Sequence, residues 1–282
     1  MQCVWESFIH LLPLWMREQV DKQGKDRLQE LRMRLGTPLQ MVLDDRIIKG
    51  NRLIDSDDIN HTINMASKYS PWATATTADG YITVHGGHRI GLCGITVNAD
   101  GKTSNIHKLT SICIRIARNL TGIAKDAWKT EGSILIIGAP GSGKTTLLRD
   151  LICSHSNHKD AAISVVDERQ EIFPCNNGIF CFDIGSNTDV ISGCSKSEGI
   201  EAALRNTGPT IIAVDEITAQ SDCDSLMNAA YCGVDLIATA HAASSKDLHL
   251  RSVYRPLVDS RLFDHLLVMV KEFDLKLYQY SS

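Results

Sequence analysis

Short apolar runs alternate with longer amphipathic stretches through the second half of the chain. Buried, β-branched strands are predicted at residues 133–137, 162–166, 210–214 and 236–240. The stretch 145–152, directly after the first strand, has the apolar spacing of a helix packed on a sheet. This alternation predicts a parallel sheet flanked by helices, and the runs at 266–271 and 275–280 predict a closing antiparallel hairpin.

The first half has a different pattern, in which apolar and polar residues alternate over short distances. This pattern predicts a smaller α+β domain. Its predicted elements are a strand at 28–35, a hairpin at 39–43 and 46–49, a helix at 57–69, a second hairpin at 81–85 and 89–97, a turn at 100–101 and a strand at 112–117. The boundary is placed within 122–132, which gives an N-terminal domain of residues 1–124 and a second domain of residues 125–282.

One loop in the second domain carries the most specific motif. Residues 138–145 read Gly-Ala-Pro-Gly-Ser-Gly-Lys-Thr and fit the phosphate-loop pattern G-x-x-x-x-G-K-[ST] at every fixed position. A strand before it and a helix after it would point several backbone N–H groups at one anion. Lys144 is expected to reach the β- and γ-phosphates, and the Thr145 hydroxyl to hold Mg²⁺. The alternative is a glycine turn with a chance lysine.

The loop makes the second domain a P-loop NTPase of the RecA/AAA type, with a parallel sheet flanked by helices. The residues predicted to bind nucleotide are Gly138, Ala139, Pro140, Gly141, Ser142, Gly143, Lys144, Thr145 and Thr146.

Three more predicted strands end in polar residues, at the edge where open α/β sheets bind ligands. Asp215 can orient the Mg²⁺ shell together with Thr145, and Glu216 can polarise the attacking water. Glu168, in the acid pair after the second strand, is predicted to support catalysis, and His241 to sense the γ-phosphate. The alternative is that these residues have only structural roles. The acids would then cap the segment that follows each strand, and the histidine would hydrogen-bond within its loop.

Arg205 precedes the strand that ends in the second acid pair. It is a candidate for neutralising developing phosphate charge, or for pairing with a carboxylate instead.

Composition narrows the class of protein only a little. The 282 residues carry a net charge of −4, which gives no overall attraction to nucleic acid or anionic membrane. An odd number of scattered cysteines without C-x-x-C pairs predicts reduced thiols in a cytosolic compartment; they are Cys3, Cys93, Cys113, Cys153, Cys175, Cys181, Cys194, Cys223 and Cys232. No stretch has the apolar length of a membrane-spanning helix. An apolar stripe near the N-terminus is expected to be buried against the next domain rather than to dock on a membrane surface.

The four boxes formed by the phosphate loop, the two acid pairs and Thr239-Ala240-His241 resemble, in order, those of the type II and type IV secretion ATPases. The chain more closely resembles the stage III sporulation protein AA family of spore-forming Firmicutes. The matching stretches are 30–34 (Glu-Leu-Arg-Met-Arg), 86–94 (Gly-Gly-His-Arg-Ile-Gly-Leu-Cys-Gly), 114–118 (Ile-Arg-Ile-Ala-Arg), 143–150, 166–169, 188–190 and 196–199.

This resemblance implies a cytoplasmic ATPase on the mother-cell side, using ATP and Mg²⁺. It would energise a secretion-like channel between mother cell and forespore, most simply as a homo-hexamer that reaches the membrane through membrane-embedded channel proteins. In the secretion ATPases, basic residues of the N-terminal domain complete the site, which makes Arg89, Arg115 and Arg118 candidates. The alternative is that these arginines pair with local carboxylates or lie on a solvated face of their domain. Two positions depart from the expected pattern, because Asn187 replaces a basic residue and Ala242 a glycine.

Other classes of protein are compatible with the same loop. A nucleic-acid-translocating motor of this fold is the main alternative, and the acidic net charge and the lack of a basic and aromatic stripe weigh against it. A module that only changes shape with nucleotide is disfavoured by Glu216, and a small-molecule kinase by the lack of a recognisable lid or acceptor site.

Overall fold

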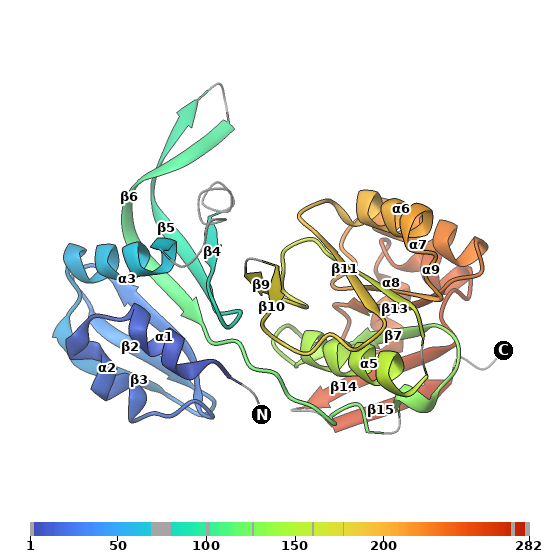
Figure 1. Ribbon diagram of the computed structural model, residues 1–282, viewed down its shortest axis with the longest axis horizontal. Helices are drawn as coiled ribbons and strands as arrows, with labels where there is room; N and C mark the ends of the chain where they lie inside the picture. The colour runs from blue at the N-terminus through green and yellow to red at the C-terminus, as the bar shows by residue number, and fades with distance from the viewer. Residues whose placement is uncertain are drawn as a thin grey trace. The chain divides into compact units, whose positions relative to one another are not determined.

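The computed structural model describes residues 3–68, 80–99, 102–125, 127–159, 161–176, 178–271 and 274–279. The chain divides into two compact units (Figure 1). The N-terminal unit contains Met1–Asn119 together with Pro174–Phe182, and the C-terminal unit contains Leu120–Phe173 and Asp183–Ser282. The predicted turn at 100–101 lies outside the described residues.

The N-terminal unit is built on a six-stranded antiparallel sheet of order β3-β2-β1-β6-β5-β4. Its strands are β1 (Leu28–Arg34), β2 (Pro38–Leu43), β3 (Ile47–Leu53), β4 (Tyr81–Thr83), β5 (Arg89–Ala99) and β6 (Lys102–Arg115). Both predicted hairpins are confirmed, and β6 begins ten residues before the predicted strand at 112–117, because it pairs with β5 along its length. A further short hairpin, β9 (Cys175–Asn176) and β10 (Ile179–Phe180), belongs to the same unit.

Three helices complete the core of this unit: α1 (Trp5–Leu11), α2 (Leu14–Asp21) and α3 (Ser56–Lys68). Apolar residues of all three helices form one cluster with residues of the sheet. Phe8 and Leu12, from the apolar N-terminal stripe, have no exposed surface in this cluster. The stripe is therefore buried within its own unit.

The C-terminal unit has a seven-stranded sheet of order β11-β8-β12-β13-β7-β14-β15. All neighbouring strands are parallel except β14 and β15, which form the predicted antiparallel hairpin. The strands are β7 (Ile134–Ile137), β8 (Ile163–Asp167), β11 (Thr188–Ser192), β12 (Ile211–Val214), β13 (Asp235–Ala240), β14 (His265–Lys271) and β15 (Asp274–Gln279). The predicted fold class is confirmed, whereas the short edge strand β11 was not predicted because its residues, Thr-Asp-Val-Ile-Ser, lack a long apolar run.

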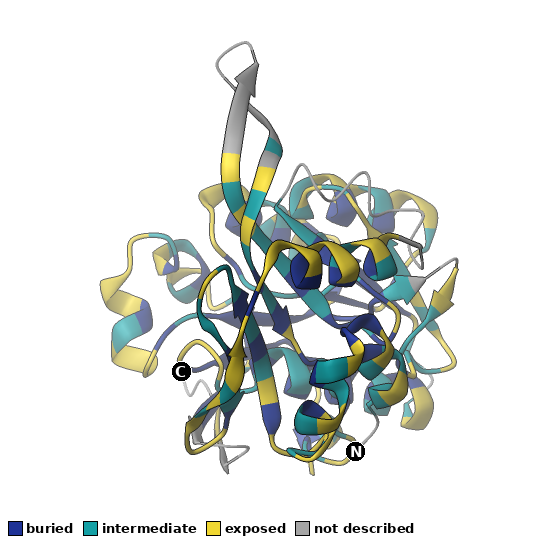
Figure 2. Ribbon diagram, turned by 90° about the vertical axis from the view of Figure 1, so that its left-hand side faces the viewer, coloured by how far each residue is buried: buried dark blue, intermediate teal, exposed yellow. Residues whose placement is uncertain are grey.

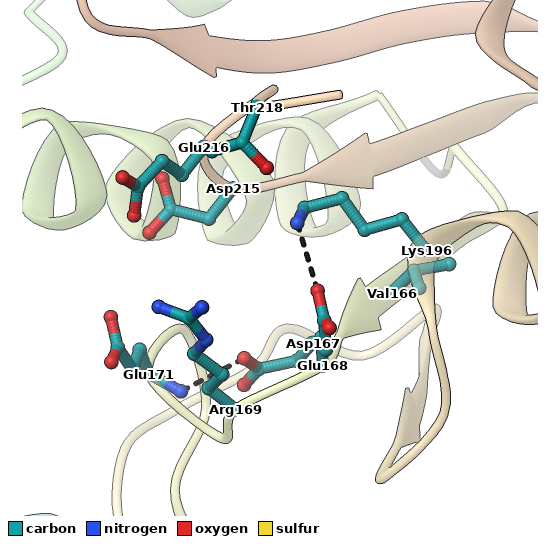
Figure 3. A pocket seen from close by; sticks show the side chains of 9 residues that line it. All are labelled: Val166, Asp167, Glu168, Arg169, Glu171, Lys196, Asp215, Glu216 and Thr218. Atoms are coloured by element: carbon teal, nitrogen blue, oxygen red, sulfur yellow. Dashed lines mark hydrogen bonds and ion pairs between the residues drawn. The ribbon is translucent and has the colours of Figure 1, made fainter. Parts of the chain in front are cut away.

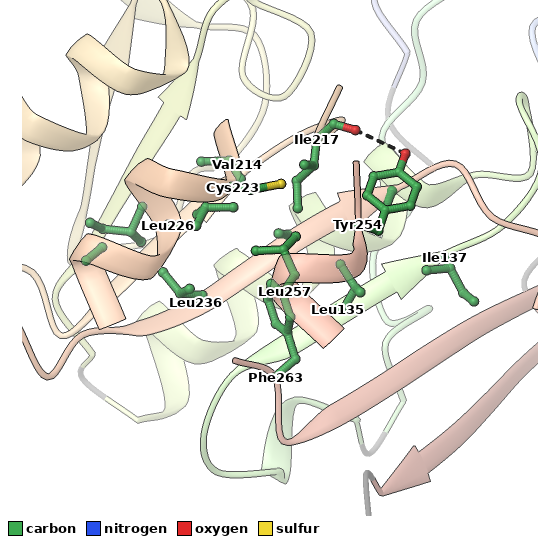
Figure 4. Close-up of a cluster of buried hydrophobic side chains, with 14 of the residues drawn as sticks. Leu135, Ile137, Val214, Ile217, Cys223, Leu226, Leu236, Tyr254, Leu257 and Phe263 are labelled. Carbon is green, nitrogen blue, oxygen red and sulfur yellow. Dashed lines mark hydrogen bonds between the residues drawn. The ribbon is translucent and has the colours of Figure 1, made fainter. Parts of the chain in front are cut away.

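Helices cover both faces of this sheet. The helix α5 (Lys144–His158) lies on one face, and α6 (Lys196–Asn206), α7 (Gln220–Tyr231), α8 (Ser245–Leu250) and α9 (Arg255–Asp259) are on the other (Figure 1). The 3-10 helix η1 (Ala127–Lys129) contacts α5. On that second face, residues of β7, β12 and β13 pack with Leu226, Leu257 and Phe263 (Figure 4). The helices are buried on the side that faces a sheet and exposed on the other (Figure 2).

Two further expectations from the sequence can be compared with the structure. All nine cysteines are free. Within the described residues, none of the helices combines the length and the apolar character that a membrane span requires.

Candidate functional site

The phosphate loop connects β7 to α5 at the carboxyl edge of the parallel sheet. Gly141 and Gly143 have φ angles of +75° and +94°, a region that L side chains rarely adopt. A Cβ at Gly138 would lie 2.6 Å from the Ser142 Oγ, so this glycine is required for close packing of the loop. The Ser142 Oγ is itself buried without a hydrogen-bond partner among the described residues. The first turn of α5 offers backbone N–H groups with no intrahelical acceptor, and the loop therefore fits an anionic ligand.

Lys144, the first residue of α5, directs its ammonium group back over the loop. Its Nζ donates to the carbonyl oxygens of Gly138 and Ala139, both at 2.9 Å, and lies 3.0 Å from the Nδ1 of His241. Burial lowers the pKa of Lys144, while the carboxylates of Asp215 and Glu216 act in the opposite direction. The lysine is thus held between the loop and His241, with the carboxylates of Asp215 and Glu216 nearby.

Thr145 and Asp215, the two residues predicted to hold Mg²⁺, are in direct contact. The Thr145 hydroxyl donates to Asp215 Oδ2 at 2.6 Å, and the other oxygen of this carboxylate accepts from the Thr239 hydroxyl. Thr239, which the sequence analysis did not single out as a site residue, also accepts the Glu216 N–H at 2.8 Å. It therefore fixes both residues of the acid pair from the neighbouring strand.

Glu216 and His241 form the next link in this network. The His241 Nε2 lies 3.0 Å from Glu216 Oε1, and both side chains are partly exposed. Glu216 has a φ of +53°, which is uncommon for a residue with a side chain and typical of functional sites. The local backbone therefore turns this carboxylate away from the course of β12 and toward the histidine.

A tyrosine that the sequence analysis missed joins the two loops that carry these residues. The Tyr254 hydroxyl donates to the Ile217 carbonyl at 3.1 Å and accepts the His241 N–H at 3.3 Å (Figure 4). The residue is 6% exposed, and burial raises its pKa. No local motif marks such a residue, because its function depends on where α9 packs.

Asp167 is the first residue of the acid pair at the end of β8. Its side chain is buried and caps backbone N–H groups, and it does not face solvent. Its carboxylate accepts the backbone N–H groups of Glu171, Ile172 and Phe173 at 2.8–3.0 Å. Burial raises its pKa to about 6, although these hydrogen bonds act in the opposite direction. The capping alternative considered for this acid pair is the one that the structure shows for Asp167.

Glu168 faces a pocket beside the acid pair of β12 (Figure 3). Its Oε2 lies 2.9 Å from the Lys196 Nζ, which is also 3.9 Å from Asp222 Oδ2. Asp222 accepts the N–H groups of Thr218 and Ala219, in the loop that follows Glu216. Lys196 belongs to a stretch that carries the family resemblance, yet its partner could not be read from the sequence.

The structure does not bring Arg205 to this site, which corrects the prediction of a role beside the phosphates. Arg205 lies in the last turn of α6 and pairs with Glu201 at 3.3 Å, with both side chains 67% exposed. The first turn of α6 lies at the pocket, because Lys196 reaches Glu168. The helix then runs toward the opposite edge of the sheet, where it leads into the start of β12, and it carries Arg205 away.

Two of the upstream arginines have partners within the N-terminal unit. The Arg89 guanidinium lies 4.0 Å from the centroid of the Tyr81 ring, and the Arg118 Nε donates to the Lys25 carbonyl at 2.8 Å.

Two positions depart from the expected family pattern, and both have an ordinary structural setting. Asn187 donates its backbone N–H to the Ser156 Oγ, and Ala242 is buried and does not have a left-handed φ.

Comparison with known sequences places the chain in a family. The model of the family "Sporulation stage III, protein AA" matches residues 6–275. Stage III sporulation protein AA of Bacillus subtilis is 33% identical over 262 residues, which are 88% of this chain and 84% of the relative. Competence protein ComGA of Halalkalibacterium halodurans is 29% identical over 118 residues, 42% of this chain and 32% of the relative.

Two solved structures share the fold. The ATPase DotB of Legionella pneumophila has a TM-score of 0.59 at 18% identity and covers 91% of this chain and 76% of its own. The pilus retraction motor PilT, solved with bound ADP, has a TM-score of 0.59 at 16% identity, with coverage of 90% and 76%. Fold and site together define a P-loop NTPase with the architecture of these proteins. The chain belongs to the Sporulation stage III, protein AA family.

Proposed function

We propose that this protein hydrolyses ATP with Mg²⁺ and uses the energy to drive a secretion-like channel between mother cell and forespore. The observation that carries the proposal is the continuous network at one edge of the sheet. It joins the phosphate-loop lysine to His241 and Glu216, and the Thr145 hydroxyl to Asp215. Binding groups and a carboxylate suited to activating water are thereby held in one place.

Each residue of the network has a defined task in this reaction. The backbone N–H groups of the loop and Lys144 would bind the β- and γ-phosphates. Glu216 would accept a proton from the water that attacks the γ-phosphorus. The bond from that phosphorus to the β–γ bridging oxygen breaks, and ADP departs with the electron pair. His241 orients the carboxylate through its hydrogen bond to Oε1.

Thr145 and Asp215 are the residues that would hold Mg²⁺. Hydroxyl and carboxylate oxygens are the ligands this ion prefers, and the pair is already joined at 2.6 Å. The bound ion would neutralise charge on the phosphate oxygens.

The biological setting follows from the family. We propose a cytoplasmic protein on the mother-cell side that acts as a homo-hexamer and reaches the membrane only through membrane-embedded channel proteins. The relative in Bacillus subtilis is named for stage III of sporulation. Co-purification from sporulating cells with and without ATP tests the partner, and sedimentation of purified protein with plain lipid vesicles tests direct membrane binding, which we expect to be absent.

Hydrolysis is tested by measuring phosphate release from the full-length chain with ATP and Mg²⁺. Glu216→Gln keeps the size of the side chain and removes its basicity, so we expect ATP affinity to be kept and turnover to fall by about 10²-fold or more. The exposed Glu201→Gln is the matched control. Equal turnover in Glu216→Gln and the wild type would move the catalytic role to another acid, with Glu168 the next candidate.

A further inference from the structure

Arg169 lines the same pocket as Asp215 and Glu216, although it follows a different strand. It is the third residue of a turn in which the Gln170 N–H donates to the Asp167 carbonyl at 3.2 Å. Gln170 has a φ of +55°, so the chain reverses sharply after Arg169. In Figure 3 the guanidinium group extends into the pocket on the side of the β12 acid pair.

A buried carboxylate and a buried guanidinium both hydrogen-bond to the backbone that follows this turn and hold it in place. The Asp167 carboxylate accepts three backbone N–H groups just beyond Arg169. The guanidinium of Arg149, which is 6% exposed, donates to the carbonyls of Ile172 at 2.6 Å and Glu171 at 3.3 Å. Because the backbone is fixed on both sides, only the Arg169 side chain has to be ordered when it contacts a ligand.

The charged groups around Arg169 already have partners. Glu168 pairs with Lys196, Asp215 accepts from Thr145, and Glu216 contacts His241. Within the described part of the chain, the Arg169 side chain makes no hydrogen bond or ion pair. A guanidinium presents a rigid fork of donors that matches the oxygens of a phosphate group.

We propose that Arg169 contacts the γ-phosphate of bound ATP and stabilises the charge that develops on it during transfer to water. The inference rests on the proposed function and deepens it, because it assigns to the site an arginine of the same unit that carries the phosphate loop. Two other arginines of this unit are engaged elsewhere. The Arg149 guanidinium donates to backbone carbonyls, and Arg205 pairs with Glu201 at the other edge of the sheet. Lys144 serves both phosphates, whereas Arg169 distinguishes ATP from ADP.

The test is a pair of nucleotide titrations on the full-length protein, one with ADP and one with ATPγS, a slowly hydrolysed analogue. Arg169→Ala should keep ADP affinity within about twofold and weaken ATPγS by about tenfold, the size expected for one charge-assisted hydrogen bond. Phosphate release from ATP should fall by about 10²-fold or more. The control, Arg46→Ala, removes an exposed arginine between β2 and β3 and should behave as wild type.

Two more variants keep the proposal falsifiable if Arg169→Ala folds poorly. Arg169→Gln retains the length of the side chain and should show the same selective loss, and Arg169→Lys should recover part of it. Equal weakening of ADP and ATPγS, or unchanged binding of both, would overturn the assignment. The ratio of the two affinities decides this point even if the wild-type protein releases no phosphate, an outcome that would contradict only the proposed hydrolysis.

Discussion

Lys144 and His241 are 97 positions apart in the chain, and a hydrogen bond of 3.0 Å joins the Nζ of the lysine to the Nδ1 of the histidine. An ammonium group can only donate, so Nδ1 accepts. The proton of the neutral ring is then on Nε2, where it is donated to Glu216 Oε1 at 3.0 Å. One tautomer of His241 therefore connects the phosphate-binding lysine to the carboxylate proposed to activate water.

Replacing His241 with alanine should impair chemistry more than binding. Glu216 would lose the donor that orients it, whereas Lys144 would keep its two carbonyl acceptors in the loop. We expect the Kd for ATP to change by less than about threefold and turnover to fall by about tenfold or more. Nucleotide titration and phosphate release measure the two quantities; a loss confined to binding would contradict the role.

Lys144→Ala should abolish ATP binding while leaving the fold intact. The ammonium group is the cation of the phosphate loop, and its removal takes away the charge opposite the β- and γ-phosphates. Nucleotide titration gives the affinity, and circular dichroism checks the fold. Lys49→Ala, an exposed lysine on β3, is the matched control. If the Lys144→Ala protein is folded and binds ATP with the affinity of the wild type, the assignment of the phosphate loop is contradicted.

Lys196 and Glu168 should be energetically coupled. Lys196 is 11% exposed, so removing either partner leaves a charge in a partly desolvated place. A double-mutant cycle of Lys196→Met and Glu168→Gln, followed by denaturant unfolding, should give a coupling of about 1 kcal/mol in the free energy of unfolding. Strictly additive effects would show that the 2.9 Å contact contributes nothing measurable.

Tyr254→Phe should loosen the two loops that carry Glu216 and His241. The change leaves the Ile217 carbonyl and the His241 N–H without their partner, which costs about 1–2 kcal/mol in the free energy of unfolding. Turnover should fall with little change in ADP affinity, because the phosphate loop is untouched. Tyr231→Phe, which alters a tyrosine 81% exposed, is the control. Unchanged stability and turnover would contradict the linking role.

Acid should destabilise the N-terminal unit through His88, the histidine of the Gly86-Gly87-His88 stretch. Its Nε2 lies 3.1 Å from the Val4 carbonyl and its Nδ1 accepts the Ala117 N–H at 3.1 Å. Burial lowers its pKa from 6.5 to about 4. Because the folded state favours the neutral ring, this contribution is complete above pH 6.5 and is lost as the pH falls toward 4.

The measurement is the free energy of unfolding at pH 7 and pH 4.5. We expect the wild type to lose on the order of 2 kcal/mol more than His88→Gln between these two pH values. His10→Gln, an exposed histidine on α1, should have the pH dependence of the wild type. The same pH dependence in His88→Gln and the wild type would show that His88 does not titrate with unfolding.

Most elements of the C-terminal unit, and the edge of its sheet at which the candidate site lies, could be predicted from the amino-acid sequence. A buried strand, a glycine loop and an amphipathic helix are encoded by residues adjacent in the chain. Parallel strands place their carboxyl ends at one edge, so Asp215, Glu216, Glu168 and His241 could be assigned to that edge without knowing any contact. The family resemblance was equally readable, because it depends on short contiguous motifs, and the family comparison confirms it.

The contacts between these side chains, in contrast, could not be predicted and are seen only in the folded chain. Asp167 and Glu168 are neighbours in sequence, yet one is a buried cap and the other pairs with Lys196, 28 positions later. Arg205 was a candidate either for the phosphates or for pairing with a carboxylate, and the structure shows the pairing, with Glu201. Sequence proximity to β12 does not reveal the direction in which α6 runs. Thr239, Tyr254 and Arg169 carry no signature of their roles. Their partners come from elements placed beside them by packing of the whole unit, and local periodicity does not encode such long-range contacts.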